Sequence, residues 1–250
     1  MRSPAKALIF CIGLLIPTTQ AKADFFTPIS LSGVVNARLQ VAHPEYPQGS
    51  GILLGDVPFD IASVGRNAWF ASFAASGGAG TVSTTIPVGM SGVVGVHTLI
   101  NTLWGRSGTP SLANLRFNFS DGSSFVKLLV GDEDIRDYYQ NTFTNVINNT
   151  TTVRVFFTDT DGPAGPNRYR LDKQFIDLSA FSQKTLVSMT LTDSGNENFQ
   201  RTVLSGVTVQ TVPEPSSFVL ATLGAVGVLG LARRSSTRNP RQRTTDPRVS

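Results

Sequence analysis

Cysteine is nearly absent from this sequence of 250 residues, because its single Cys, Cys11, lies in a segment that we expect to be removed. A mature chain without Cys forms no disulfide bond and offers no thiol for catalysis or metal binding. Charge is also scarce, since residues 24–212 hold 12 Lys and Arg against 15 Asp and Glu, a net charge of −3. The formal net charge of +4 therefore comes from the two ends of the chain, and we expect no nucleic acid as a partner.

The N-terminal segment has the three parts of a secretory signal peptide. Arg2 and Lys6 supply the basic start, residues 7–16 are mostly apolar, and Ala21 and Ala23 are the small residues of a cleavage site. The apolar stretch is too short to cross about 30 Å of hydrocarbon as a helix, which argues against a membrane anchor here. We therefore expect export by the general secretory route and cleavage after Ala23.

A Pro-Glu-Pro motif, an apolar run and an arginine pair follow one another near the C-terminus. Their members are Pro213, Glu214 and Pro215, then residues 216–232, then Arg233 and Arg234. As an α-helix the apolar run would measure about 26 Å, at the short edge of what spans a membrane. Arginines directly after a spanning helix hold that side in the cytoplasm. A buried core helix is the alternative, but such helices rarely end in a basic tail.

This order of motif, apolar run and arginines resembles the PEP-CTERM sorting signal of Gram-negative bacteria. The resemblance implies that an exosortase in the inner membrane recognises the Pro-Glu-Pro motif, cleaves near it, and releases the protein to the cell surface or the exopolysaccharide matrix. One departure is that family members usually end soon after the arginines, whereas this chain continues to Ser250. The expected domains are a signal peptide at residues 1–23, a folded domain at 24–211, the sorting signal with its transmembrane helix at 212–234, and a basic cytoplasmic tail at 235–250.

Between the two ends, apolar residues alternate with polar ones, which is typical of strands with one buried face. Leu115, Phe117 and Phe119, for example, are separated by polar residues. This period predicts an all-β, jelly-roll-like antiparallel β-sandwich, with a β-barrel as the alternative. A helical turn is expected only at residues 132–142. The expected strands lie near residues 32–40, 51–62, 67–74, 80–88, 92–101, 112–119, 124–130, 151–158, 169–178, 185–192 and 199–211.

Two stretches of the body carry a second resemblance. Residues 55–61 read Gly-Asp-Val-Pro-Phe-Asp-Ile, and residues 98–105 read Thr-Leu-Ile-Asn-Thr-Leu-Trp-Gly. The first resembles a stretch near the start of NPCBM-type carbohydrate-binding modules, and both resemble segments of secreted proteins with this sorting tail. The resemblance implies a galactose-binding-like jelly-roll fold. We expect Pro58 at a strand edge, with Phe59 and Ile61 facing the core.

Aromatic side chains that stack on pyranose rings are the basis of sugar recognition by many β-sandwiches. Trp104 ends an expected strand before a loop with Gly and Ser, so we expect it to be exposed. Tyr138 and Tyr139 adjoin an acidic segment and are expected to form a rim. Tyr46 and Trp69 are further candidates, with core packing as the alternative for Trp69. The candidate saccharide site therefore consists of Trp104, Tyr138 and Tyr139.

Two acidic segments offer carboxylates for other chemistry. Asp132, Asp134 and Asp137 lie in the first, and Asp159 and Asp161 lie in the second. One interpretation of the first segment is a solvated loop, compensated by a neighbouring arginine. A calcium site is another, because Ca²⁺ takes about six to eight oxygen ligands, and catalytic carboxylates are a third. Neither segment has the ligand spacing of an EF-hand.

Residues suited to nucleophilic catalysis are few. The expected mature chain has only His43 and His97, and His97 lies in an apolar strand, where a structural role is expected. Asp193, Ser194 and Gly195 lack the flanking glycines of a hydrolase motif. We therefore expect no enzyme, and no cofactor beyond a structural calcium ion. The expected function is a structural or adhesive role at the cell surface or in the exopolysaccharide matrix, with a carbohydrate-binding module as the alternative.

Overall fold

Strands make up nearly all of the regular structure, as the alternation of apolar and polar residues predicts. The structure is a computed structural model that describes residues 25–42, 44–71, 80–105, 107–138, 145–158, 169–195 and 201–212. The elements in chain order are β1 (Phe25–Ile29), α1 (Leu39–Ala42), β2 (Gly49–Leu54), β3 (Val57–Ile61), β4 (Trp69–Phe70), β5 (Val82–Met90), β6 (Val93–Leu103), β7 (Gly108–Phe119), β8 (Ser124–Gly131), β9 (Thr152–Phe157), β10 (Arg170–Asp177), the 3-10 turn η1 (Ser179–Phe181), β11 (Leu186–Asp193) and β12 (Arg201–Thr211).

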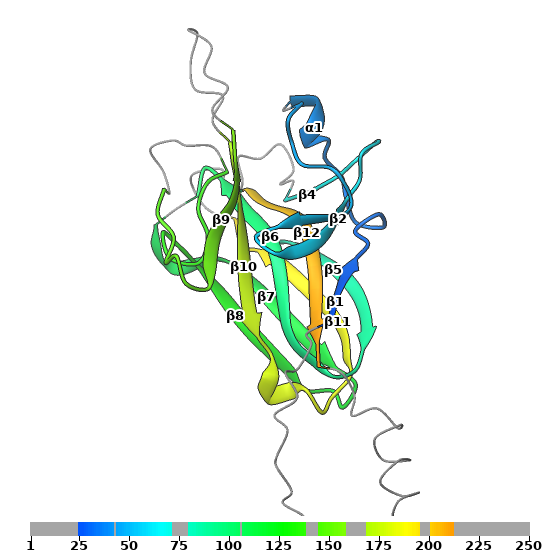
Figure 1. The fold of residues 1–250 in the computed structure, drawn as a ribbon. Helices are drawn as coiled ribbons and strands as arrows, with labels where there is room; N and C mark the ends of the chain where they lie inside the picture. Colours follow the sequence, from blue (N-terminus) through cyan, green and yellow to red (C-terminus); the bar gives the residue numbers. More distant parts are fainter. Residues whose placement is uncertain are drawn as a thin grey trace, which may run out of the picture.

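The strands form two antiparallel sheets and a separate hairpin (Figure 1). The larger sheet has the order β1-β12-β6-β10-β9, with the short β4 also paired to β12. The smaller sheet has the order β5-β11-β7-β8, and β2 pairs with β3 in the hairpin. The predicted all-β antiparallel sandwich is confirmed. In the described part of the chain the sheets remain two layers and do not close into the alternative β-barrel.

The space between the two sheets is filled by aliphatic and aromatic side chains. Leu115 and Phe117 of β7 pair with Leu191 and Met189 of β11, and all four are buried in one cluster. Val96 of β6 joins this cluster from the larger sheet. Burying a side chain of this size contributes about 1.5–3 kcal/mol relative to leaving it in water. The predicted alternation therefore holds the two sheets together face to face.

A second apolar core lies between the hairpin and the larger sheet, where the hairpin crosses β6 and β12 (Figure 1). Phe59 and Ile61 of β3 are buried there in one cluster with Leu99 of β6. Gly206 of β12 makes this approach possible, because a Cβ at that position would lie 2.9 Å from Phe59 Cδ1. The expectation that Phe59 and Ile61 face a core is confirmed, although this core is outside the two-sheet interior.

Residues 51–62, which we expected to form one strand, belong to the two strands of the hairpin. Gly55 and Asp56 connect β2 to β3 with positive φ values of 58° and 63°. Two successive residues of this kind form the tight turn that best matches the twist of a hairpin. Lys173 Nζ of β10 donates a hydrogen bond of 2.5 Å to the Gly55 carbonyl oxygen, which fixes the turn to the sheet.

Residues 32–40 do not form the expected strand, but a turn followed by the start of α1. The N–H groups of Val34 and Val35 both donate to the carbonyl oxygen of Leu31, at 2.9 and 3.0 Å. These bonds close a tight turn, which an extended chain cannot make. The strand-like pairing of this segment is limited to an isolated bridge between Ala37 and Ala68.

Residues 132–134 form a tight turn, in which Asp134 N donates to the Val130 carbonyl oxygen at 2.8 Å, but the helical turn expected at 132–142 does not continue through residues 135–138, and its remainder lies outside the described residues. Thr102 N donates to the Arg136 carbonyl oxygen at 2.9 Å, and Tyr138 N donates to the Thr102 carbonyl oxygen at 2.7 Å. On its other side, the Tyr138 carbonyl oxygen accepts from Arg170 N at 2.8 Å. Residues 136–138 are therefore extended and inserted between the ends of β6 and β10.

Candidate functional site

The first acidic segment is buried against the larger sheet. Asp134 and Asp137 are only 2% and 0% exposed. Asp134 Oδ1 lies 2.8 Å from Lys127 Nζ, while Asp137 Oδ1 accepts from Thr102 Oγ1 at 2.8 Å and from Gly105 N at 2.7 Å. The interpretation of this segment as a solvated loop is therefore wrong at these two carboxylates. They hold the inserted segment to β6 and β8.

Arg136, the arginine between these two carboxylates, forms a buried ion pair. Its Nε and Nη2 donate to the two carboxylate oxygens of Asp172 at 2.8 and 2.7 Å, and its Nη1 donates to the Asn145 carbonyl oxygen at 3.1 Å. Asn101 Nδ2 donates to Asp172 Oδ2 at 2.7 Å. Paired N–H···O bonds of this kind are among the strongest that side chains form. The network therefore compensates the charge of Arg136 on several sides.

Arg170 extends this network at the start of β10. Its Nε donates to the Asp137 carbonyl oxygen and its Nη2 to Asn145 Oδ1, both at 2.8 Å. Burial lowers the pKa of Arg170 to about 10, and the positive charge of Arg136 acts in the same direction. Arg170 is therefore still a cation at neutral pH, and its partners are oxygens.

The three described carboxylates of the calcium prediction do not converge on one point. Asp132 Oδ1 accepts from the N–H groups of Asn145 and Val146 at 2.8 and 3.0 Å, apart from the donors that bind the two buried carboxylates. Among the described residues, no group of three His, Cys, Asp or Glu residues is arranged to hold a metal ion. The remaining members of the predicted set, Asp159 and Asp161, lie outside the described residues.

The aromatic candidates for sugar binding are separated by their burial. Trp104 is 42% exposed, as expected from its place before a loop, and its φ of 53° is in the left-handed region. Tyr138 is only 9% exposed, so it does not form the expected rim, and Tyr139 lies outside the described residues. Tyr46 and Trp69 are buried in the cores. Of the described candidates, only Trp104 is exposed.

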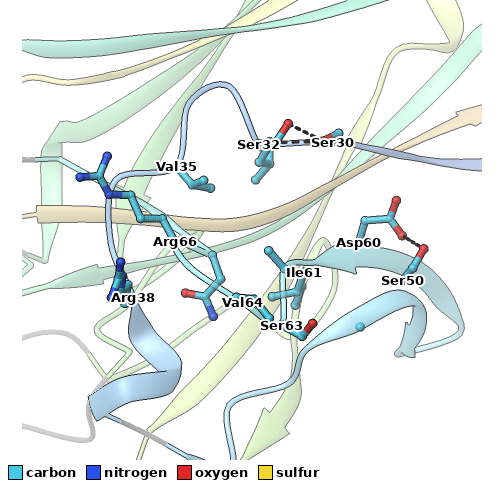
Figure 2. A pocket seen from close by; sticks show the side chains of 14 residues that line it. Ser30, Ser32, Val35, Arg38, Ser50, Asp60, Ile61, Ser63, Val64 and Arg66 are labelled. Carbon is cyan, nitrogen blue, oxygen red and sulfur yellow. Dashed lines mark hydrogen bonds between the residues drawn. The ribbon is translucent and has the colours of Figure 1, made fainter.

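A pocket of about 730 Å³ lies between the turn after β1, the start of β2 and the loop after β3. Arg38 and Arg66 lie at one end of the pocket, and Asp60 and Ser50 lie at the other (Figure 2). Asp60 Oδ1 accepts from Ser50 Oγ and from Gly51 N, both at 2.8 Å. This pocket was not predicted, because its residues in the sequence are only two arginines in Ser-containing segments without a regular period.

The two arginine-bearing walls of the pocket are fixed to each other by hydrogen bonds. Asn67 N donates to the Ala37 carbonyl oxygen at 2.8 Å, and Leu39 N donates to Asn67 Oδ1 at 2.9 Å. Gln40 Nε2 donates to the Gly65 carbonyl oxygen at 2.6 Å. Arg38 and Arg66 are each next in sequence to a residue of this set, so their backbones are held close together.

The remaining candidates for acid–base chemistry have structural contacts. His97 is buried between two phenylalanine rings, and its Nε2 lies 3.1 Å from Gln210 Oε1. Asp193 Oδ2 accepts from both the N–H and the Oγ1 of Thr202, at 2.7 Å each. These contacts fit the structural role that we expected for His97. His43 lies outside the described residues.

The described fold defines an all-β sandwich domain, and the comparison with known families adds the sorting signal. The model of the PEP-CTERM protein-sorting motif matches residues 211–234, directly after the domain. This match confirms the expected motif. It indicates a secreted surface protein that an exosortase sorts after transient anchoring in the membrane of a Gram-negative bacterium. No curated protein matches the chain.

Several expected features of the two ends lie outside the described residues. They are the cleavage site at Ala21 and Ala23, the sorting residues Pro213, Glu214, Pro215, Arg233 and Arg234, and the apolar run at 216–232. Within the described ranges, no helix is long and apolar enough to cross a membrane. The signal peptide, the transmembrane helix and the resemblance to NPCBM-type modules stay predictions.

Proposed function

We propose that the sandwich domain has a non-catalytic, structural or adhesive role at the cell surface or in the exopolysaccharide matrix, after a signal peptide of residues 1–23 is removed. The sorting motif directly after β12 supports this destination. The observation that carries the role is the use of the buried carboxylates. Asp134, Asp137 and Asp172 each bind partners within the domain.

This use of the carboxylates favours structure over catalysis. A glycosidase places two carboxyl groups on either side of an open site, about 5–10 Å apart, where a glycosidic bond and water can reach them. Asp134 and Asp137 are buried, and their oxygens already accept from Lys127, Thr102 and Gly105. Their removal is therefore expected to loosen the fold rather than to abolish turnover.

Fractionation of cells that produce the full chain tests the proposed destination. We expect the mature protein in the surface or matrix fraction, beginning at Asp24 and ending near Pro215 by mass spectrometry. A Glu214→Ala variant in the sorting motif is expected to accumulate in the inner-membrane fraction. A full-length product, Ser250 included, dissolved in the cytosol would contradict the proposal.

Incubation of the secreted protein with the exopolysaccharide of the producing cells tests the non-catalytic role. We expect the polymer to keep its length while a fraction of the protein sediments with it. Shortening of the polymer by the wild type, but not by a folded Asp134→Asn or Asp137→Asn variant, would show that the protein is an enzyme.

A carbohydrate-binding module is the second candidate, and the exposure of Trp104 is the observation that favours it. Stacking on a pyranose ring requires an accessible aromatic face, and Trp104 provides one. A Trp104→Ala variant is then expected to lose saturable binding on a glycan array. Phe25→Ala, which removes another exposed aromatic ring, is the matched control and should bind like the wild type.

A further inference from the structure

The guanidinium groups of the two pocket arginines have no partner in the described part of the chain. There, the side chains of Arg38 and Arg66 form no hydrogen bond, ion pair or ring contact, and both residues are exposed. A guanidinium carries five N–H donors in a planar fork that matches a carboxylate, so two of them side by side form an anion site. The end of the pocket that holds Arg38 and Arg66 therefore offers an anion a set of unoccupied N–H donors.

The hydrogen bonds across the pocket wall hold this end in place before a ligand arrives. Arg38 directly follows Ala37, whose carbonyl oxygen accepts from Asn67 N, and Arg66 directly precedes Asn67. Both side chains therefore start from backbone that the fold has already ordered. Binding then costs the entropy of the two side chains but not that of two loops.

A buried donor at the same wall also lacks a partner. Asn67 lines the pocket and is 2% exposed. Its Oδ1 accepts from Leu39 N, which orients the amide, but its Nδ2 has no hydrogen-bond partner. A buried donor without a partner costs about 1–3 kcal/mol, so a small shift of this wall that exposes Asn67 Nδ2 to a ligand oxygen would be favourable.

The opposite end of the pocket limits how much negative charge the ligand carries. Asp60 lies there with Ser50, and Ser30 and Ser32 line the pocket as well (Figure 2). The Asp60 carboxylate repels a second anionic group inside the pocket but accepts hydrogen bonds from neutral hydroxyl groups, and serine hydroxyls both donate and accept. The lining therefore suits a molecule with one anionic group and several hydroxyl groups.

We propose that this pocket binds a uronic acid residue of an acidic polysaccharide, with its carboxylate on Arg38 and Arg66 and its hydroxyl groups toward Ser50 and Asp60. The volume of about 730 Å³ lies within the roughly 300–1,000 Å³ of pockets that bind small ligands. The proposal specifies the class of ligand that the adhesive role would use. It rests on that role, because the polysaccharide is taken to be part of the matrix in which the protein resides. It assigns the sugar to a site away from Trp104.

Calorimetry on the mature protein, purified from the matrix of producing cells, tests this assignment. The probe is a galacturonic acid oligosaccharide, and its methyl ester is the matched control, because esterification removes the charge but keeps the ring hydroxyls. We expect Arg38→Gln and Arg66→Gln each to weaken binding of the acid about tenfold, which is the loss of one charge-assisted pair. Arg116→Gln, on an exposed arginine of β7, should bind like the wild type.

The outcomes separate this proposal from the adhesive role itself. The pocket assignment would be overturned if the wild type bound the acid and the ester equally, or did not bind the acid at all. It would also be overturned if the Arg38→Gln, Arg66→Gln double variant bound the acid as tightly as the wild type. Retention of that double variant in the matrix would leave the adhesive role standing. If the wild type binds the acid but is not retained in the matrix, the adhesive role is overturned and the pocket assignment stands.

Discussion

Arg136 and Arg38 carry the same guanidinium in opposite surroundings. Arg136 is buried and donates to both carboxylate oxygens of Asp172, whereas the Arg38 side chain is exposed in the pocket and donates to none of the described residues. Taking an ion out of water costs several kcal/mol, so a buried cation is kept only with a partner, and an exposed cation needs none. Burial therefore separates the charges that maintain this fold from those that remain available for a ligand.

The largest loss of stability is expected from breaking the buried ion pair between Arg136 and Asp172. Asp172→Asn leaves the charge of Arg136 buried without a counter-charge, and we expect it to lower the free energy of unfolding by about 3–5 kcal/mol. Denaturant titration measures this change. Asp121→Asn is the control at an exposed pair, where Lys184 Nζ lies 2.7 Å from Asp121 Oδ2, and its midpoint should shift far less. Similar shifts in both variants would contradict the role of burial.

Removal of a buried carboxylate that faces neutral donors should cost less. Asp137→Ala leaves Thr102 Oγ1 and Gly105 N without this acceptor, and we expect a loss of about 1–3 kcal/mol of stability. Because Gly105 follows Trp104, the tryptophan emission should change as well. Thr102→Val removes only one of the two donors and should have a smaller effect. A Thr102→Val variant as unstable as Asp137→Ala would show that the carboxylate itself contributes little.

Tyr46 is a buried ionisable group that burial keeps neutral, in contrast to the buried charge of Arg136. Its hydroxyl is hydrogen-bonded to Ser205, and burial raises its pKa well above the ordinary value of 10. Tyr46→Phe should cost about 1 kcal/mol at neutral pH. Above about pH 10 the unfolded state loses the phenol proton and the folded state keeps it, so wild-type stability falls with rising pH. The wild type should therefore lose its advantage over Tyr46→Phe by about pH 11, because one pH unit above the ordinary pKa costs it about 1.4 kcal/mol, as measured by denaturant titration. A difference that is constant with pH would contradict the raised pKa.

The smallest change in stability is expected at the pocket. Arg38→Gln and Arg66→Gln remove exposed charges that stabilise no partner, so we expect the free energy of unfolding to change by less than about 0.5 kcal/mol. Thermal melts of both variants and of the Arg116→Gln control provide the measurement. A loss as large as that expected for Asp172→Asn would place these arginines among the structural charges.

The strands were predictable wherever one face meets a core and the other meets water. Leu115 and Phe117 alternate with polar residues because β7 is covered on one side only, and that pattern is local. Residues 135–138 were predicted wrongly because their conformation depends on distant partners. Asp137 is buried only since Thr102 and Gly105 provide donors, and no local period shows this.

The candidate site was less predictable than the fold for the same reason. The exposure of Trp104 followed from its place at a strand end, but Tyr138 became buried through its backbone pairing with β6 and β10. Arg38 and Arg66 come together through the bridge between Ala37 and Ala68 and the hydrogen bonds beside it, which join segments distant in the sequence. The sorting motif can be recognised in the sequence because its residues are contiguous. The residues of the pocket come from separate segments, so no contiguous motif marks them.

The pairing of β1 with β12 bears on how the domain carries mechanical load. Phe25 pairs with Thr211 at one end of β1 and Ile29 with Val207 at the other, after which the chain enters the pocket wall (Figure 1). If a ligand holds the pocket end of the domain and force is applied at its C-terminal end, β12 is therefore stretched along its length. Its hydrogen bonds to β1 and β6 lie across that direction, so they resist in shear and must rupture together rather than one by one.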